Sequence, residues 1–394
     1  MIQKIKNVAG NEVIIFAETF EYEAYDQLKK LINFDAYISS KVRIMPDAHA
    51  GKGCMVGTTM TIQDKITPNL VGVDIGCGML TIKLKDKEID FPKFDKIINE
   101  KIPNGFNVHT DIKKDFDFSK LRCKKHVDLT RANLSIGSLG GGNHFIEVSE
   151  SSKGELYLII HSGSRKLGGD ICKYYQKKAF ANVNEMSKVR VNLINKLKLE
   201  GRSKDISAEI KKIKKPRTDR ELAFLIGDDF NDYMNDMEIA QRYATSNREI
   251  IASIIIKESK LHEESRFETI HNYIDFKRMI LRKGAVSAEY GEILLIPINM
   301  SDGSLLCTGK GNADWNYSAP HGAGRLLSRS KAKKLIDIDE FKKSMTEVYS
   351  SSVGVSTLDE APQAYKSIEE IKRAIVDTAN IIDVLKPLYN FKSH

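Results

Sequence analysis

Short apolar runs separated by glycines and polar residues dominate the first half of the chain. Residues 13–16 form one such run and predict a strand, whereas residues 21–31 have the spacing of a helix. From residue 42 to residue 84, glycines alternate with short β-branched runs, which is typical of strands joined by tight turns. The compact apolar run at residues 155–160 predicts another strand, with His161 at its end.

The pattern changes between residues 171 and 260, where glycine becomes scarce and helical spacing takes over. The Lys-rich stretch 186–215 predicts a projecting helical hairpin, broken at Pro216, that is either a solvated face or a guide for RNA. Strands and glycine-rich loops return over residues 261–330, and residues 337–385 have a helical pattern. Within the helical block, an amphipathic face is formed by Met237, Ile239, Ala240, Tyr243 and Ala244.

Chemistry-bearing segments occur both before and after this helical block. We therefore predict an α+β fold in a single catalytic domain spanning residues 1–394, with residues 171–260 as a helical insertion or one face of that domain. The chain is long enough to bury a sizeable core, and its 41% hydrophobic and 29% charged residues are typical of a soluble globular protein.

Composition and charge narrow the class of protein. No run of about 18 apolar residues occurs, so we expect no membrane span, and the N-terminus lacks the apolar stretch of a signal peptide. The five scattered cysteines do not suggest a disulfide framework, and we predict reduced thiols in a cytoplasmic protein. The net charge of +8 permits a polyanionic partner such as nucleic acid but does not require one.

A carboxylate and a thiol lie three residues apart in the glycine-rich segment 71–78. Asp74 and Cys77 can face one point because the glycines let the backbone turn tightly, and a thiolate can bridge two cations. The alternative is an ordinary buried cysteine in a turn. On intrinsic affinity such a site prefers Zn²⁺ to Mn²⁺. Further ligands that would converge only through the fold are His144, His161 and His271.

His321 differs from these histidines because its neighbours are small. A neutral imidazole with room around it can attack phosphorus and form a covalent phosphoramidate, whereas a further metal ligand or a helix-start histidine is the alternative. The small neighbours are Ser318, Ala319, Pro320, Gly322, Ala323 and Gly324.

Three arginines lie in or beside glycine- and serine-containing loops. Guanidinium groups match phosphate oxygens bidentately, so we interpret the three as phosphate-binding, although a surface salt bridge is the commoner role of any one arginine. The glycine run before Asn143 could also approach a phosphate, but it lacks the lysine of a P-loop. His49 is ambiguous, as an imidazole oriented by Asp47 or as a phosphate contact. The arginines are Arg165, Arg325 and Arg329.

Eight segments, in order along the chain, resemble the signature blocks of the RtcB family of RNA ligases. Two of them are Gly72-Val-Asp-Ile-Gly-Cys-Gly-Met79 and Ser318-Ala-Pro-His-Gly-Ala-Gly-Arg325. This resemblance implies β-sheets packed with helices around a central metal cleft. The other segments are residues 45–53, 141–147, 161–165, 282–285, 359–366 and 385–388.

The resemblance implies a ligase that uses GTP and two Mn²⁺ ions. Such an enzyme joins RNA ending in a 3′-phosphate or 2′,3′-cyclic phosphate to RNA with a 5′-hydroxyl, in RNA repair or tRNA splicing. Cys77 would bridge the two ions. His144 and His161 would complete one metal site, and Asp74 and His271 would complete the other.

By the same resemblance, His321 would attack the α-phosphate of GTP and carry GMP to the RNA end. Glu147 would accept from the N1–H and 2-amino edge of guanine, Lys392 would lie near guanine O6, and Asn143 would contact the α-phosphate. The rest of the nucleotide pocket would come from Ser318, Gly322, Ala323 and Gly324. RNA or nucleotide phosphates would be held by Arg165, Arg325 and Arg329.

Two alternative functions stay open, and one segment differs from the family's sequence. Residues 298–303 read Ile-Asn-Met-Ser-Asp-Gly where the family has Pro-Gly-Ser-Met-Gly, so the resemblance does not fix guanine specificity. A metal-dependent 2′,3′-cyclic phosphodiesterase that does not ligate would keep the metal residues without needing His321 or Glu147. A non-catalytic RNA-binding protein would need neither the metal residues nor His321 and Glu147. The natural RNA, an accessory activator and the oligomeric state are likewise open.

Overall fold

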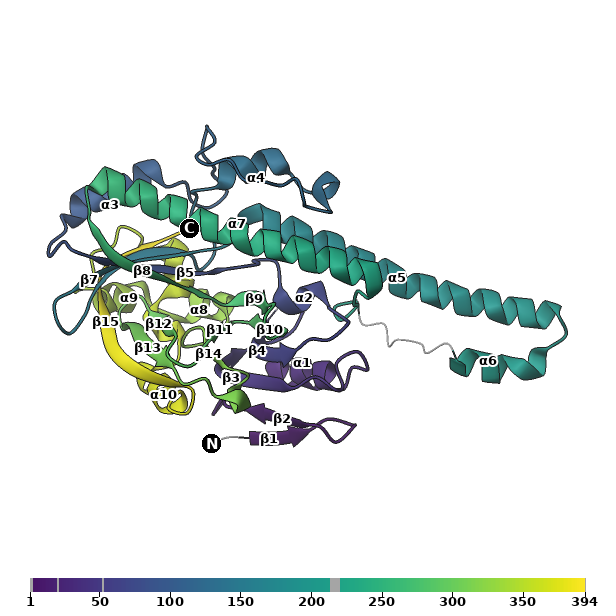
Figure 1. The fold of residues 1–394 in the computed structure, drawn as a ribbon. Helices are drawn as coiled ribbons and strands as arrows, with labels where there is room; N and C mark the ends of the chain where they lie inside the picture. The colour runs from purple at the N-terminus through teal and green to yellow at the C-terminus, as the bar shows by residue number, and fades with distance from the viewer. Residues whose placement is uncertain (1–2, 20, 52, 213–219, 394) are drawn as a thin grey trace.

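Two large β-sheets and a layer of long helices make up the protein (Figure 1). The structure, a computed structural model, describes residues 3–19, 21–51, 53–212 and 220–393, with residues 183–192 and 210–212 described by their backbone alone. This mixed arrangement confirms the predicted α+β class.

The six-stranded sheet takes four strands from residues 3–61 and two from residues 272–283. Helix α1 (Tyr22–Ile32) confirms the predicted helix, and it packs Leu28 and Leu31 into the same core as Ile44 of the sheet. The strands, in spatial order, are β1 (Gln3–Lys6), β2 (Glu12–Ile15), β3 (Val42–His49), β4 (Val56–Thr61), β10 (Ile280–Lys283) and β9 (Asn272–Asp275).

The seven-stranded sheet is antiparallel throughout and contains the strands that surround the candidate metal residues. Helix α3 (Phe91–Lys101) and the second half of α7 (Gly227–Ser259) cover one of its faces, where Phe94 and Ile251 pack against Ile82. The strands, in spatial order, are β12 (Ile293–Asn299), β13 (Gly303–Gly309), β15 (Ala379–Lys392), β6 (Phe145–Glu150), β7 (Leu156–Ser162), β5 (Gly78–Leu84) and β8 (Glu263–Ile270).

The predicted helical block begins with α5 (Arg165–Leu199), which extends well beyond the sheets (Figure 1). A turn and α6 (Ile206–Lys212) follow, so the projecting Lys-rich hairpin is confirmed as far as residue 212, whereas Pro216 lies outside the described residues. Helix α7 returns to the body and lies on the seven-stranded sheet, so this part of the block forms one face of the fold. None of the helices in the described ranges has the length and apolarity to cross a membrane.

The predicted helical tail is wrong from residue 379 onward. Three short helices lie between residues 329 and 374. The chain then forms the 14-residue strand β15 between β13 and β6. Pairing on both sides overrides the local helical pattern, because strand preference depends on burial against neighbours. The short helices are α8 (Arg329–Leu335), α9 (Ile338–Ser344) and α10 (Ile368–Ala374).

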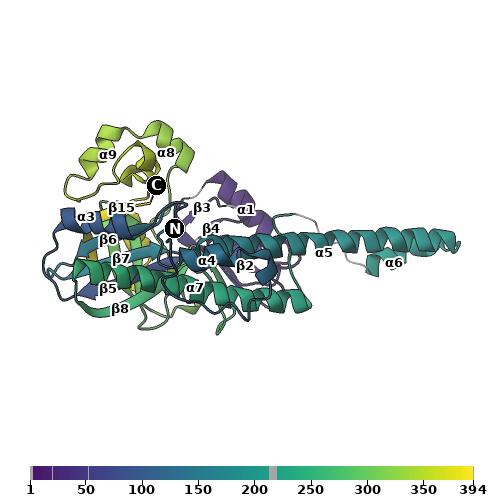
Figure 2. The same ribbon diagram turned by 90° about the horizontal axis from the view of Figure 1, so that it is seen from above.

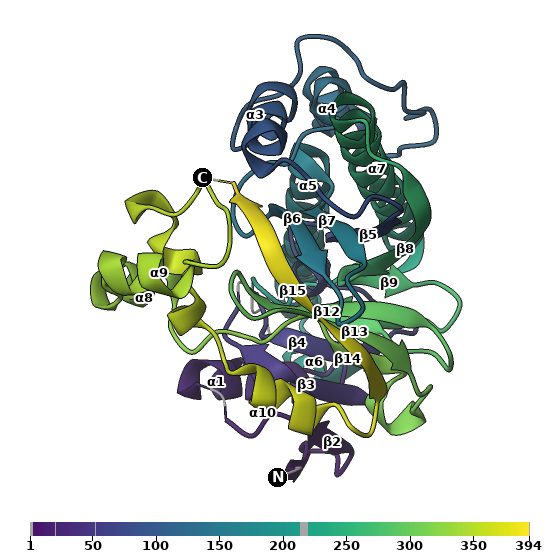
Figure 3. The same cartoon turned by 90° about the vertical axis from the view of Figure 1, so that its left-hand side faces the viewer.

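Helices α8 and α9 form a small lobe at the edge of the molecule, away from α5 (Figures 2 and 3). Met300, from the turn between β12 and β13, is buried in the lobe's core beside Phe341 and Leu358. The remaining elements are α2 (Pro68–Val71), α4 (Leu129–Ser135), the pair β11 (Ala285–Ser287) and β14 (Ser318–Pro320), and short 3-10 turns at Lys124–His126, Ser203–Asp205, Ala313–Trp315, Val355–Glu360 and Pro362–Ala364.

Candidate functional site

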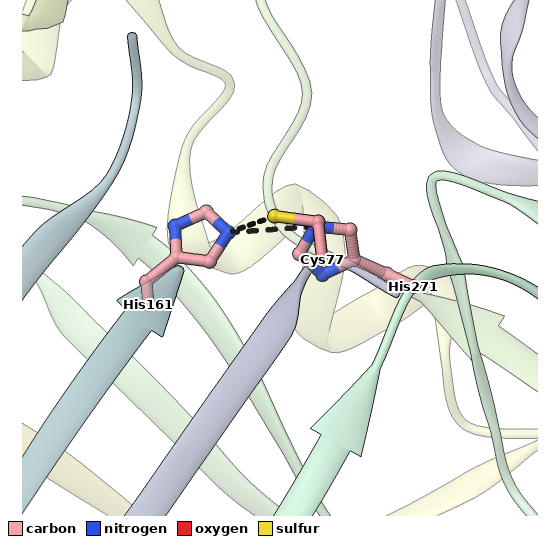
Figure 4. A group of neighbouring side chains, drawn as sticks. All are labelled: Cys77, His161 and His271. Carbon is pink, nitrogen blue, oxygen red and sulfur yellow. Dashed lines mark hydrogen bonds between the residues drawn. The ribbon is translucent and has the colours of Figure 1, made fainter. Parts of the chain in front are cut away.

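Three neighbouring strands bring a thiol and two imidazoles together. Gly78 of β5 lies opposite Ser162 of β7 and Ile270 of β8, so Cys77, His161 and His271 meet at one end of these strands. The Cys77 Sγ atom lies 3.3 Å from His161 Nε2, which lies 3.4 Å from His271 Nε2 (Figure 4). All three side chains are buried, and their ligand atoms lie within 4.8 Å of one another.

A second ligand set shares the thiol. His144 Nε2 lies 3.4 Å from Cys77 Sγ and 2.9 Å from Asp74 Oδ2, and these three ligand atoms also lie within 4.8 Å of one another. Cys77 therefore belongs to both sets, which is the position that a bridging thiolate would need. The structure groups the other ligands differently from the prediction: β7 and β8 flank β5 and bring His161 beside His271, whereas His144 lies beside Asp74.

Two of the three histidines, His161 and His271, have the protonation that a metal ligand needs. His161 Nδ1 donates to the Asn143 carbonyl at 3.2 Å, which leaves the Nε2 lone pair facing Cys77. Burial holds the pKa of His161 and of His271 well below the usual range, so both imidazoles are neutral. Neutral imidazole is the form that binds a divalent cation.

The anionic donors complete a set that suits cations. Burial raises the pKa of the Cys77 thiol, and the neighbouring Asp74 carboxylate raises it further, so a bound cation would take the place of the thiol proton. Burial also opposes ionisation of Asp74, but the contact with His144 and the positive charge of Arg165 outweigh it and keep the pKa of this carboxyl below its usual value. The residues present therefore fit one or two divalent cations.

Helix α7 holds the backbone around these ligands through two buried side chains. Arg248 is fully buried, and its Nη1 donates to the carbonyls of Gly76 at 2.7 Å and Ser162 at 2.6 Å, which are the residues next to Cys77 and His161. Asn247 Nδ2 donates to the Ser138 carbonyl at 3.1 Å and to the Gly163 carbonyl at 3.2 Å.

Sequence reasoning missed Asn247 and Arg248. The available signal was an adjacent amide and guanidinium on the apolar face of a helix, between Ala244 and Ile251. Such groups stay buried only when they have partners.

A cleft opens on the His161 and His271 side of the metal set and extends to the α8–α9 lobe. It brings together seven of the predicted nucleotide-binding residues: Asn143, Glu147, His321, Gly322, Ala323, Gly324 and Lys392. Ser318 is the exception, because it is fully buried away from the lining, accepts from Arg282 Nε at 2.8 Å and donates to the Asn316 carbonyl at 2.7 Å. The prediction that Ser318 contacts the nucleotide is therefore not supported by its position.

His321 is oriented by a buried carboxylate. Its Nδ1–H donates to Asp47 Oδ2 at 2.5 Å, and its backbone N–H donates to the same oxygen at 3.1 Å. The lone pair of Nε2 is therefore the reactive one, and the ring lies 4.9 Å from the His271 ring, centroid to centroid. Gly324 permits this approach, because a Cβ there would lie 2.4 Å from the Asp47 carbonyl oxygen.

Asp47 also contacts His49, the histidine for which two roles are predicted. His49 Nδ1 donates to the Asp47 backbone carbonyl at 2.9 Å, whereas the Asp47 carboxylate accepts from His321. His49 also lines the cleft.

Strands β6 and β15 build the far wall of the cleft. Their register places Glu147 opposite Asn390 and Phe145 opposite Lys392, so all four side chains lie on one face of the pair. Glu147 accepts from Ser149 Oγ at 2.7 Å and from Asn390 Nδ2 at 2.7 Å. Burial raises the pKa of Glu147 to about 7.

Three cations of the cleft share one buried carboxylate. Glu360 accepts from Arg329 at 2.6 Å, from Lys392 at 3.1 Å and from Arg325 at 3.4 Å. Burial opposes ionisation of Glu360, but the three cations outweigh it and lower its pKa to about 2. Arg325 and Arg329 both line the cleft, as predicted.

Arg165 lies apart from the other two arginines. Its Nη1 donates to His144 Nδ1 at 3.1 Å, and it lines a second depression with Arg131, Lys166 and Lys173. Gly140 makes room for it, because a Cβ there would overlap the Arg165 guanidinium. The three predicted phosphate-binding arginines therefore divide between two concave surfaces.

Comparison with known proteins gives consistent matches over most of the chain. A family model described as tRNA-splicing ligase RtcB matches residues 27–128 and 116–393. The chain is 28% identical over 405 residues to the RNA-splicing ligase RtcB of Escherichia coli strain K12, covering 92% of each protein. It is 26% identical over 425 residues to the tRNA-splicing ligase RtcB of Nanoarchaeum equitans, covering 84% of this chain and 83% of that protein.

Proposed function

The chain belongs to the RtcB family of RNA-splicing ligases, and on that basis we propose that it is a GTP- and Mn²⁺-dependent RNA ligase. It would join RNA ending in a 3′-phosphate or 2′,3′-cyclic phosphate to RNA with a 5′-hydroxyl, through a covalent histidine–GMP intermediate. One observation carries the proposal: a single cleft holds His321, the base-facing pair Glu147 and Lys392, and two of the metal-set histidines.

In the first step, His321 Nε2 attacks the α-phosphorus of GTP. An N–P bond forms, the bond from the α-phosphorus to the bridging oxygen breaks, and pyrophosphate leaves. Asp47 holds the Nδ1 proton and stabilises the positive charge that develops on the ring, which is the task of an aspartate behind a catalytic histidine.

In the second step, an oxygen of the RNA 3′-phosphate attacks the phosphorus of histidine–GMP, and the N–P bond breaks. The RNA 5′-hydroxyl then attacks the 3′-phosphorus, forming the new phosphodiester and releasing GMP. A cyclic end would first be opened by water. When bound, two divalent cations at the shared-thiol ligand sets would neutralise phosphate charge and polarise the attacked phosphorus.

The wall formed by β6 and β15 supplies the base contacts in this proposal. Glu147, when ionised, accepts from the N1–H and 2-amino group of guanine, and Lys392 donates to O6. Asn143 and residues 322–324 line the same cleft as His321 and would contact the α-phosphate. Arg325 and Arg329 would exchange Glu360 for nucleotide phosphates, and Arg165 would contact RNA in its own depression.

The domain assignment is part of the same proposal. We treat residues 1–394 as one catalytic domain in which α7 is a structural face of the site, because Asn247 and Arg248 hold the loops that carry the metal ligands.

A cyclic phosphodiesterase without ligase activity would need the metal ligands alone. The pair of His321 with the buried Asp47, and the Glu147 wall, have no task in that reaction, and they favour the ligase.

The test uses a nicked RNA stem-loop with 2′,3′-cyclic phosphate and 5′-hydroxyl ends, together with GTP and Mn²⁺. We expect joined RNA from the natural chain and from His262→Ala, a control at an exposed histidine, but none from His321→Ala. Opening of the cyclic end without joining, in the presence of GTP, would favour the phosphodiesterase and overturn the ligase.

A further inference from the structure

One polar atom in the wall of the cleft has no task in the proposed reaction. Eight buried side-chain nitrogen or oxygen atoms lack a hydrogen-bond partner within the described part of the chain. Two belong to residues that line the cleft, and one of these, His271 Nδ1, is on a metal-set ligand. The other is Asn390 Oδ1, on a side chain whose residue is 1% exposed. A buried acceptor without a donor is destabilising, so its retention needs an explanation.

The orientation of the Asn390 amide follows from its neighbour. A carboxylate only accepts, so the amide nitrogen must face Glu147, and Nδ2 donates to Glu147 Oε2 at 2.7 Å. The amide oxygen is therefore directed away from Glu147. A flip of the amide would place two acceptors against each other, which excludes the opposite assignment while Glu147 is ionised.

The sheet register places this amide in the base-reading row. Asn390 lies directly opposite Glu147, and Lys392 lies two residues farther along β15, on the same face and about 7 Å away along the strand. The two strands thus offer a donor at Lys392 and, one step along, two acceptors side by side at Glu147 and Asn390 Oδ1. The hydrogen-bonding edge of guanine carries complementary groups: the acceptor O6, followed by the two donors N1–H and the 2-amino group.

We propose that Asn390 is a specificity-determining residue whose Oδ1 accepts from the 2-amino group of guanine. This inference rests on the proposed function, because it places guanine against Glu147. The 2-amino group has two hydrogens, so it can donate to Glu147 with one and to Asn390 with the other. Asn390 also fixes the Glu147 carboxylate through Nδ2, so it acts on base choice both directly and by orienting its neighbour.

Inosine triphosphate tests this contact, because hypoxanthine differs from guanine only in lacking the 2-amino group and so loses the hydrogen bonds to both Glu147 and Asn390. The experiment measures the second-order rate of enzyme guanylylation or inosinylation with each nucleotide. We expect the natural chain to prefer GTP by about tenfold or more, the loss that follows when a buried acceptor stays unpaired. In Asn390→Leu, which keeps the branched shape and removes the acceptor, the preference should fall by about threefold or more but stay above one, because Glu147 still accepts from the 2-amino group.

Ser149→Ala is the matched control. Ser149 donates to the other oxygen of Glu147, but it is fully buried and does not line the cleft. Its removal should slow GTP and inosine triphosphate alike and keep their ratio. If Asn390→Leu does not fold, as judged by thermal unfolding, Asn390→Ser takes its place.

Two results would overturn the inference: equal use of the two nucleotides by the natural chain, or an unchanged preference in the folded Asn390 variant. Either result would leave the ligase proposal standing. Failure of the natural chain to form an adduct with either nucleotide would instead contradict the proposed function itself.

Discussion

The metal side and the nucleotide side of the cleft are held together by different means. On the metal side, neutral imidazoles are fixed through backbone groups, as where His161 donates to the Asn143 carbonyl and Arg248 spans the carbonyls of Gly76 and Ser162. On the nucleotide side, cations are fixed through a carboxylate, since Arg325, Arg329 and Lys392 converge on Glu360.

In the proposed function, the two sides receive different ligands, a cation on one side and a nucleotide on the other. Backbone carbonyls cannot leave, so the metal ligands keep their positions before a cation arrives, which is the arrangement that favours tight and specific binding. A carboxylate can be exchanged for a phosphate, so the cations of the other side are paired before the nucleotide arrives and can be paired again afterwards. We expect mutations on the two sides to have separable effects.

The largest effect is expected at the junction of the two sides. Asp47→Asn should slow guanylylation by about 10²–10⁴-fold, because the amide no longer stabilises the charge on His321. Mn²⁺ binding should be unchanged, since Asp47 belongs to neither ligand set. The measurement is the single-turnover rate of GMP transfer to the protein, with Asp64→Asn as an exposed control. A comparable loss of Mn²⁺ binding would contradict the separation.

A smaller effect is expected from the helix behind the metal side. Arg248→Met should lower cation affinity by about 10–100-fold, because the loops carrying Cys77 and His161 lose their common anchor. Arg248→Lys should recover only part of it, since an ammonium cannot reproduce the guanidinium fork.

Co²⁺ absorption, which reports ligand geometry, and Mn²⁺ titration measure the effect of the Arg248 variants without any reaction. Arg242→Met, on the exposed side of the same helix, is the control. A stable Arg248→Met protein with a natural Co²⁺ spectrum would show that the anchor is dispensable.

The smallest effect is expected on the nucleotide side, as a dependence on pH. Burial raises the pKa of Glu147 to about 7, and only the ionised carboxylate accepts from the guanine N1–H. Protonation as the pH falls below about 7 should therefore raise the KM for GTP, by up to about tenfold per pH unit.

Glu147→Gln should have a flat KM profile over the same range. Mn²⁺ titration at each pH separates this trend from any change on the metal side. A KM for GTP in the natural chain that does not change as the pH falls would contradict the assigned role of Glu147.

Local chemistry made much of the site predictable from the sequence. Asp74 and Cys77 occur in one glycine-rich turn, and the three histidines occur at the ends of apolar runs, so their residue types alone indicated metal ligands. Small neighbours likewise distinguished His321. The structure brings all of these residues together.

Long-range register could not be predicted in the same way. The division of ligands between the two sets depends on β7 and β8 flanking β5. The Asp47–His321 pair joins residues 274 positions apart, and Asn390 meets Glu147 only because residues 379–392 form one long strand, whereas the sequence predicts a helix as far as residue 385.

The central claim is that His321, oriented by Asp47 beside the metal set, carries GMP. Tandem mass spectrometry of the protein after incubation with GTP and Mn²⁺ tests it most directly. The account predicts an acid-labile GMP adduct on the peptide containing His321, lost when a chelator replaces Mn²⁺. No adduct in the presence of Mn²⁺, or an adduct on another residue, would contradict it.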